Sequence, residues 1–204
     1  MLITDIIQDS FQEYQDHISL VLFSYSCNFK CNGCYNYKHV TNFNNVIDSA
    51  NKIVDKYITP LHSAVVFLGG EPTIWKEDLL SSAKHVKCKD LKVKIFTNGF
   101  LPNIIELLND NELVDAYSID LKTIRNVSEL INVKMNDEEY LYKVNLSIQR
   151  IIDADIPIEI RTTKFENVDI EEVQEYVHKK YPFIQHIIQE DFLKNFMHHK
   201  SFNV

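Results

Sequence analysis

The chain has 204 residues, a net charge of −8 and 45% apolar residues. This length can bury one sizeable core, and the acidic balance argues against a basic nucleic-acid surface. No run is long and apolar enough for a membrane span, and no signal peptide is visible, so the sequence predicts a cytoplasmic protein without nucleic-acid or membrane partners.

Apolar runs, several of them β-branched and aromatic, alternate with helical patterns along the chain. The runs predict strands at 18–25, 63–68, 91–97, 114–120, 157–163 and 184–189. The patterns between them predict helices at 44–58, 74–86, 102–110, 137–153 and 169–180. This alternation predicts parallel βα units. Polar or glycine-bearing motifs on five successive strands fit the mouth of a barrel better than the single crevice of an open sheet.

A cysteine-rich loop follows the first predicted strand, with Cys27, Cys31 and Cys34 spaced C-x3-C-x2-C. Three thiolates can hold three corners of a 4Fe-4S cluster and leave one iron open to a substrate, whereas most ferredoxin-type clusters use four cysteines. Two alternatives stay open: a zinc site that adds His39, and a closed electron-transfer cluster with a fourth ligand elsewhere. Cys88 lies in a charged stretch and is interpreted as an ordinary thiol.

The second predicted strand ends in the segment Gly-Gly-Glu-Pro at 69–72. The chain has only four glycines, and all of them lie in the motifs considered for the site. One interpretation is a tight turn from strand to helix, with Pro72 in the first helical turn. The other uses the same geometry, since Gly69 and Gly70 would let backbone carbonyls approach a cationic amino group.

Polar residues also lie at or near the carboxyl ends of the next three predicted strands. The Thr-Asn-Gly segment 97–99 indicates only a turn when taken alone. Asp120 and Lys122 share one face of the fourth strand, where they can form an ion pair or hold a zwitterionic ligand. Arg161 lies late in the fifth strand and can form a structural salt bridge or bind an oxyanion.

Together these motifs resemble the radical S-adenosylmethionine (radical SAM) superfamily. The pattern Cys-x-Gly-Cys-Tyr-Asn ending at Asn36 is similar to the activating proteins of anaerobic ribonucleoside-triphosphate reductase, and the Gly-Gly-Glu-Pro-Thr, Thr-Asn-Gly, Asp-Leu-Lys and Arg-Thr-Thr motifs follow in order. The chain departs from related activating enzymes at Phe96, where they have an aspartate. This leaves open whether a cation sits beside SAM.

The resemblance implies an α/β fold, a partial (β/α)6 barrel of the radical SAM type. It implies one domain over 1–204, with 17–190 as barrel core and 191–204 as a C-terminal tail. It also implies a 4Fe-4S cluster on the three cysteines of the loop. The SAM-binding residues that it implies are Tyr35, Gly69, Gly70, Glu71, Pro72, Thr97, Asn98, Asp120, Lys122 and Arg161.

The chemistry implied by the resemblance is reductive cleavage of SAM to methionine and a 5′-deoxyadenosyl radical. The implied partners are an anaerobic ribonucleotide reductase, which loses a hydrogen atom from a backbone glycine, and a flavodoxin or ferredoxin-type electron donor. Two other functions stay open. One is a small radical SAM enzyme acting on a metabolite, such as 7-carboxy-7-deazaguanine synthase, and the other is a non-catalytic iron–sulfur or zinc binding module.

Overall fold

A computed structural model describes residues 1–190, the side chains of Lys38 and His39 excepted. Its centre is an eight-stranded sheet of order β3-β1-β2-β4-β5-β6-β7-β8. Six of these strands are parallel neighbours: β2 (Ser19–Ser24), β4 (Ala64–Gly69), β5 (Lys92–Thr97), β6 (Ala116–Asp120), β7 (Ile158–Thr163) and β8 (Gln185–Gln189). They match the six predicted strands in order, so the predicted α/β fold with parallel βα units is confirmed. The predicted tail at 191–204 lies outside the described residues.

Two strands at one edge of the sheet were not predicted. β1 (Leu2–Ser10) runs antiparallel to β2, and β3 (Asp48–Ser49) runs antiparallel to β1. The predicted helix at 44–58 is therefore wrong in its first part, because helix α2 begins only at Ala50. The backbone N–H of Ile47 donates instead to the carbonyl of Ile3, over 2.8 Å. Pairing with a distant strand overrides the local helical preference of this segment.

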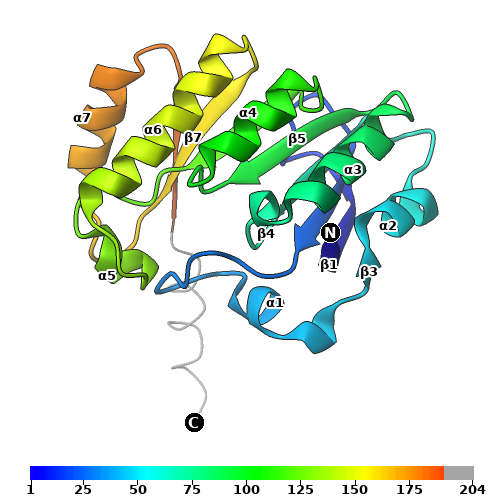
Figure 1. The fold of residues 1–204 in the computed structure, drawn as a ribbon, viewed down its shortest axis with the longest axis horizontal. Helices are drawn as coiled ribbons and strands as arrows, with labels where there is room; N and C mark the ends of the chain where they lie inside the picture. The colour runs from blue at the N-terminus through cyan, green and yellow to red at the C-terminus, as the bar shows by residue number, and fades with distance from the viewer. Residues whose placement is uncertain (191–204) are drawn as a thin grey trace.

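The helices between the parallel strands lie side by side over one face of the sheet, in the order of the strands that they connect (Figure 1). They are α2 (Ala50–Tyr57), α3 (Lys76–Lys87), α4 (Pro102–Asp110), α6 (Asp137–Asp153) and α7 (Ile170–Lys180). Two short helices lie toward the lower edge of the same view, α5 (Val127–Ile131) at the left and α1 (Tyr37–Thr41) near the centre. Among residues 1–190, no helix is long and apolar enough to cross a membrane.

Alternation along the strands separates the hydrophobic core from the inner face of the sheet. On β5, Val93 and Ile95 are fully buried in the core. Lys94 and Phe96 point to the opposite face, because successive side chains of a strand alternate. Phe96 lines a cavity there. The hydrophobic core therefore lies between the sheet and its helices. The opposite face of the sheet contributes side chains to a cavity at the strand ends.

Candidate active site

A cavity of about 690 Å³ lies where the parallel strands end. It brings together residues from five segments that are far apart in the sequence. All the predicted site residues but one line it: Cys27, Cys31, Cys34, Tyr35, Gly69, Gly70, Glu71, Thr97, Asn98, Asp120, Lys122 and Arg161. The exception is Pro72, which is buried and opens the 3-10 turn Pro72–Ile74, the role that its fixed φ allows.

The cysteine loop connects β2 to α1, and α5 fixes its position. The backbone N–H of Lys30 donates to the carbonyl of Ile131, and that of Asn32 to the carbonyl of Leu130, each over 2.9 Å. The buried ring of Phe29 packs against the ring of Phe100 at 5.4 Å between centroids. The loop is thus held by backbone bonds and an aromatic anchor. No helix was predicted at α5, which contributes to the site through its backbone carbonyls.

The three thiols of the loop are partly buried. Burial, with the charge of Glu71 as a smaller contribution, raises the pKa of Cys27 to about 12. Burial also raises the pKa of Cys31. Thiols with a raised pKa stay protonated at neutral pH, and binding to a metal displaces these protons.

Three thiols on one loop beside a cavity suit an iron–sulfur cluster, which cysteines bind through separate irons. Among the described side chains, which do not include that of His39 from the zinc alternative, no group of three His, Cys, Asp or Glu is arranged to hold a single metal ion. A cluster does not require such convergence, because each of Cys27, Cys31 and Cys34 would bind a different corner. The donor set therefore fits the cluster that the sequence predicts.

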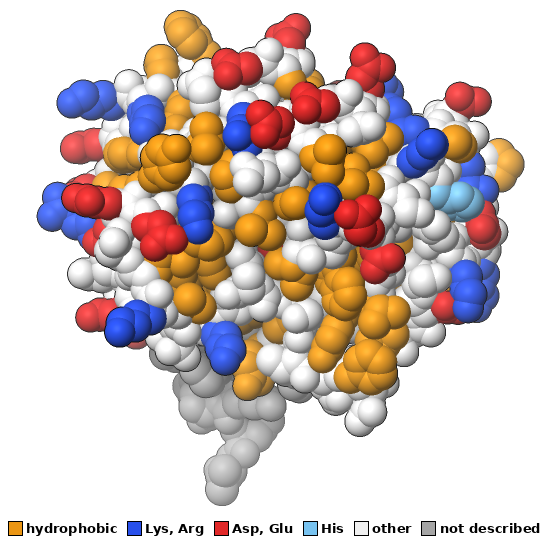
Figure 2. Space-filling model, in the orientation of Figure 1, with side chains coloured by type: hydrophobic (Ala, Val, Ile, Leu, Met, Phe, Trp, Pro, Cys, Tyr) orange, Lys and Arg blue, Asp and Glu red, His pale blue; other side chains and the backbone are white. Residues whose placement is uncertain are grey.

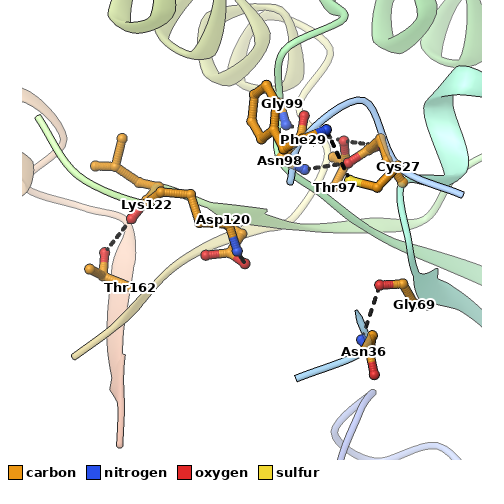
Figure 3. A network of polar contacts seen from close by, with 12 residues as sticks. Cys27, Phe29, Asn36, Gly69, Thr97, Asn98, Gly99, Asp120, Lys122 and Thr162 are labelled. Carbon is orange, nitrogen blue, oxygen red and sulfur yellow. Dashed lines mark hydrogen bonds and ion pairs between the residues drawn. The ribbon is translucent and has the colours of Figure 1, made fainter. Parts of the chain in front are cut away.

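The Gly-Gly pair packs directly on the chain that leads into the cysteine loop. A Cβ on Gly70 would lie 1.9 Å from the carbonyl oxygen of Ser26, and a Cβ on Gly69 would lie 2.7 Å from the Cα of Phe23. Gly69 also has φ +107°, which side chains disfavour. Its carbonyl accepts a hydrogen bond from the side-chain amide of Asn36 at 3.0 Å (Figure 3). The glycines therefore dock the second motif onto the first.

Glu71 connects the Gly-Gly-Glu-Pro motif to the Thr-Asn-Gly motif. Its buried carboxylate accepts hydrogen bonds from the backbone and hydroxyl of Thr73, from the hydroxyl of Thr97 at 2.6 Å and from the backbone of Asn98 at 2.7 Å. Burial raises the pKa of this carboxyl, and the four donors counter the rise. Such a satisfied buried carboxylate fixes the backbone around it. We interpret Glu71 as a residue that positions the cavity wall.

Asp120 and Lys122 form an ion pair at the end of β6. Burial alone would lower the pKa of Lys122, but the charge of Asp120 and its hydrogen bond with Lys122 raise it above its ordinary value. The second oxygen of Asp120, Oδ1, is buried and has no hydrogen-bond partner among the described residues. Asp120 faces the Asn36–Gly69 pair across the open space (Figure 3). A buried acceptor without a partner fits a donor group of a bound ligand.

Arg161 belongs to a charged group on the inner face that the sequence only partly indicated. Oε1 of Glu159 accepts from Nε of Arg161 at 2.9 Å and from Nζ of Lys94 at 3.0 Å. The ring of Phe96 lies 4.6 Å from Cζ of Arg161 and 4.9 Å from Nζ of Lys94. Burial favours a higher pKa for Glu159, but the two cations lower it below its ordinary value. Strand alternation at 94/96 and 159/161 was the signal that could have assembled this group.

Lys94 and Arg161 share the carboxylate of Glu159, and the carboxylate of Glu13 lines the same cavity. Phe96 adds no charge to this group, and its ring is a favourable neighbour for both cations. This arrangement can bind an anionic group of a ligand.

The model of the radical SAM superfamily matches residues 21–179. The chain therefore belongs to the radical SAM superfamily, whose members are enzymes that use a 4Fe-4S cluster and SAM. The three thiols of the loop fit that cluster, and the cavity adjoins them.

Among curated proteins, the chain is similar to two proteins of Methanocaldococcus jannaschii that carry the provisional name glycyl-radical enzyme activating enzyme. The first is 32% identical over 181 residues, which cover 86% of this chain and 75% of the relative. The second is 26% identical and covers 78% of this chain and 62% of the relative. A third relative from the same organism, named 7-carboxy-7-deazaguanine synthase, is 29% identical over 63% of this chain and 49% of its own length.

Solved structures share the fold. The chain superposes on anSMEcpe with bound AdoMet and a Kp18Cys peptide with a TM-score of 0.57 and 18% identity, covering 84% of this chain and 51% of that one. It superposes on TYW1 with a TM-score of 0.52 and 14% identity, covering 78% of this chain and 59% of that one. The chain thus spans little more than half the length of these structures.

Proposed function

We propose that this protein is a glycyl-radical activating enzyme. The observation that carries the proposal is the meeting of the cysteine loop, the Asp120–Lys122 pair and Arg161 on one cavity. A cluster on Cys27, Cys31 and Cys34 and SAM beside it would supply reductive cleavage to methionine and a 5′-deoxyadenosyl radical. The protein binds and orients these groups and keeps water from the cavity.

The cavity residues suit the charged methionine end of SAM. The unpartnered Oδ1 of Asp120 accepts from the ammonium group. Lys122 and Arg161 supply positive charge for the carboxylate, and charge-assisted hydrogen bonds of this kind are strong. Tyr35, at the mouth of the cavity, covers the ligand from the side of the loop. Thr97 and Asn98 contribute a wall that Glu71 keeps in place.

For the substrate we propose a backbone glycine of a partner enzyme, and specifically of an anaerobic ribonucleotide reductase. Two relatives that match most of the chain are named for glycyl-radical activation. The Cys-x-Gly-Cys-Tyr-Asn pattern resembles the activators of that reductase.

The test is anaerobic and has two stages. The protein is reconstituted with iron and sulfide, reduced with dithionite and given SAM, and 5′-deoxyadenosine is quantified. The reductase is then added, and its glycyl radical is measured by electron paramagnetic resonance. We expect nucleoside release in the first stage and a protein radical in the second. A protein that never cleaves SAM after reconstitution contradicts the proposal at its base.

A metabolite substrate is the second candidate, because one relative is named 7-carboxy-7-deazaguanine synthase. The same assay separates the two candidates. SAM cleavage that the substrate of that synthase accelerates, with formation of its product and no radical on the reductase, would assign the protein to the second function.

A further inference from the structure

Asn28 directly follows the first cysteine of the loop, and its side-chain amide lies against the sulfur of that cysteine. The Cys27 thiol donates to Oδ1 of Asn28, with 3.7 Å between sulfur and oxygen. The same oxygen accepts from Nδ2 of Asn98 at 2.8 Å. Nδ2 of Asn28 is buried and has no hydrogen-bond partner among the described residues. The oxygen of this amide is therefore fully used, while its N–H donors have no acceptor.

The hydrogen bonds of Asn98 fix the orientation of the Asn28 amide. Oδ1 of Asn98 accepts from the backbone N–H of Phe100 at 3.0 Å, so the Nδ2 of Asn98 is the atom that faces Asn28. Since that atom can only donate, Asn28 must present its oxygen to it and turn its own Nδ2 away. The backbone N–H of Asn98 donates to the buried carboxylate of Glu71 at 2.7 Å, which holds Asn98 in place.

The environment of this nitrogen excludes water as its acceptor. Charged side chains on the helical face of the molecule reach solvent, and water can complete their hydrogen bonds (Figure 2). Nδ2 of Asn28 is enclosed and lacks that solvent. Buried donors in folded proteins are almost always satisfied, and one without a protein acceptor fits an acceptor that a ligand supplies.

A cluster on the loop would supply sulfur acceptors next to this amide. When Cys27 binds iron it is a thiolate, which accepts hydrogen bonds and no longer donates to Asn28. The backbone N–H of Phe29 already donates to Sγ of Cys27 at 3.4 Å, so this sulfur receives donors from the loop. Hydrogen bonds to the sulfurs of a cluster help to set its reduction potential. They favour the reduced cluster, because it carries one more negative charge.

We propose that the side-chain amide of Asn28 donates a hydrogen bond to a sulfur of the iron–sulfur cluster and thereby raises the reduction potential of the cluster. Asn98 orients the amide, so the Thr-Asn-Gly turn after β5 acts on the cluster through Asn28. This inference rests on the proposed function, because it requires the cluster on the three cysteines. The step that it affects is the uptake of one electron from an external reductant, with no atom or proton transferred.

A redox titration of the reconstituted cluster, without SAM, tests this proposal independently of catalysis. The electron paramagnetic resonance signal of the reduced cluster is followed against the applied potential. Asn28→Leu keeps a branched side chain and removes the donors. Asn28→Asp keeps an acceptor for Asn98 and also lacks the N–H donors. The matched control is Asn32→Leu in the same loop, because Nδ2 of Asn32 donates to the carbonyl of Glu129 at 2.8 Å.

We expect both Asn28 variants to show a tenfold smaller ratio of reduced to oxidised cluster at a given potential, a shift of about −59 mV for one electron. The control should keep the wild-type potential. Electron nuclear double resonance of the reduced cluster should show an exchangeable proton coupling that wild type and control share and both Asn28 variants lack. If Asn28→Leu assembles no cluster, this coupling in Asn28→Asp decides the question.

Three results would overturn the proposal. Equal potentials in wild type and Asn28→Leu would do so, and weaker SAM binding by that variant would then assign the amide to SAM. A shift in Asn28→Asp alone, with Asn28→Leu at the wild-type potential, would be an effect of the added charge. Failure of the wild type to assemble a cluster would refute the proposed function together with this inference, whereas the first two results leave the proposed function intact.

Discussion

Charged side chains around Asp115 are fully paired at the amino ends of the parallel strands, whereas charged side chains at their carboxyl ends are incompletely paired. At the amino ends, Asp115 accepts from Lys87, Lys92 and the backbone of Val93, each within 2.9 Å. At the carboxyl ends, Asp120 keeps a buried oxygen without a partner among the described residues, and Lys94 and Arg161 share one oxygen of Glu159. Paired charges fix the fold, whereas incompletely paired ones are available to a ligand. The difference separates the structural end of the sheet from the end with the site.

The largest expected effect comes from removing a cluster ligand. Cys31→Ala should abolish cluster assembly and SAM cleavage, because a cluster with two remaining cysteines is not retained. The thermal unfolding midpoint of the protein without cluster should change by only a few degrees, since the thiol is partly exposed. Iron content, visible absorption and 5′-deoxyadenosine release are the measurements. Cys88→Ala is the control, and wild-type iron content in the Cys31 variant would refute the assignment.

Glu71→Ala should combine a loss of stability with a loss of activity. It leaves the donors of Thr73, Thr97 and Asn98 without their buried acceptor. We expect a loss of about 2–4 kcal/mol in unfolding free energy, measured by urea denaturation. SAM affinity should fall as well, because the wall at 97–99 moves. A variant with wild-type stability would show that water replaces the carboxylate and that Glu71 does not position this wall.

Glu159→Gln should weaken the orientation of Arg161 with little damage to the fold. The amide keeps one acceptor but loses the charge that holds Lys94 and Arg161 together. We expect KM for SAM to rise about tenfold and kcat to change much less, since the reacting centre is not touched. A purely structural role for Glu159 would instead lower the stability and leave KM unchanged.

Asp115→Asn should cost the least, about 1 kcal/mol in unfolding free energy. Burial favours a higher pKa for Asp115, but hydrogen bonds from Lys87 and Lys92 outweigh it and lower the pKa below its ordinary value. The stabilisation is therefore fully present above about pH 4 and is lost as the pH falls through the folded-state pKa. Wild type and variant should differ at pH 7 and converge toward pH 3 in chemical denaturation. SAM cleavage should be unaffected.

The sequence predicted the parallel strands and their order along the chain, because β2, β4 and β5 contain buried apolar runs and the other strands contain apolar residues between helical patterns. It failed at the β1 edge. The helix predicted at 44–58 starts at Ala50, since Ile47 pairs with Ile3 more than forty positions away. No local pattern carries such a pairing.

The residues of the candidate site were also predicted only in part from the sequence. The residues on conspicuous motifs, such as Cys27 and Gly69, lie on the cavity as predicted, because strands that are parallel bring their carboxyl ends to one edge. Lys94 and Glu159 were not selected, since a charged residue inside an apolar strand has no local signature of its partner. The role of Glu71 likewise depends on donors contributed by a neighbouring strand.

The sequence by itself determined the α/β class, the thiol donor set and the edge of the sheet where the motifs gather, because these follow from residue spacing and strand periodicity. Only the tertiary structure decided which polar groups are paired. It showed that Glu71 is fully satisfied, that Asp120 keeps a buried oxygen without a partner among the described residues and that the segment through Tyr37 presents hydrophobic side chains to solvent. Pairing and exposure depend on contacts between distant segments, and folding alone brings those contacts about.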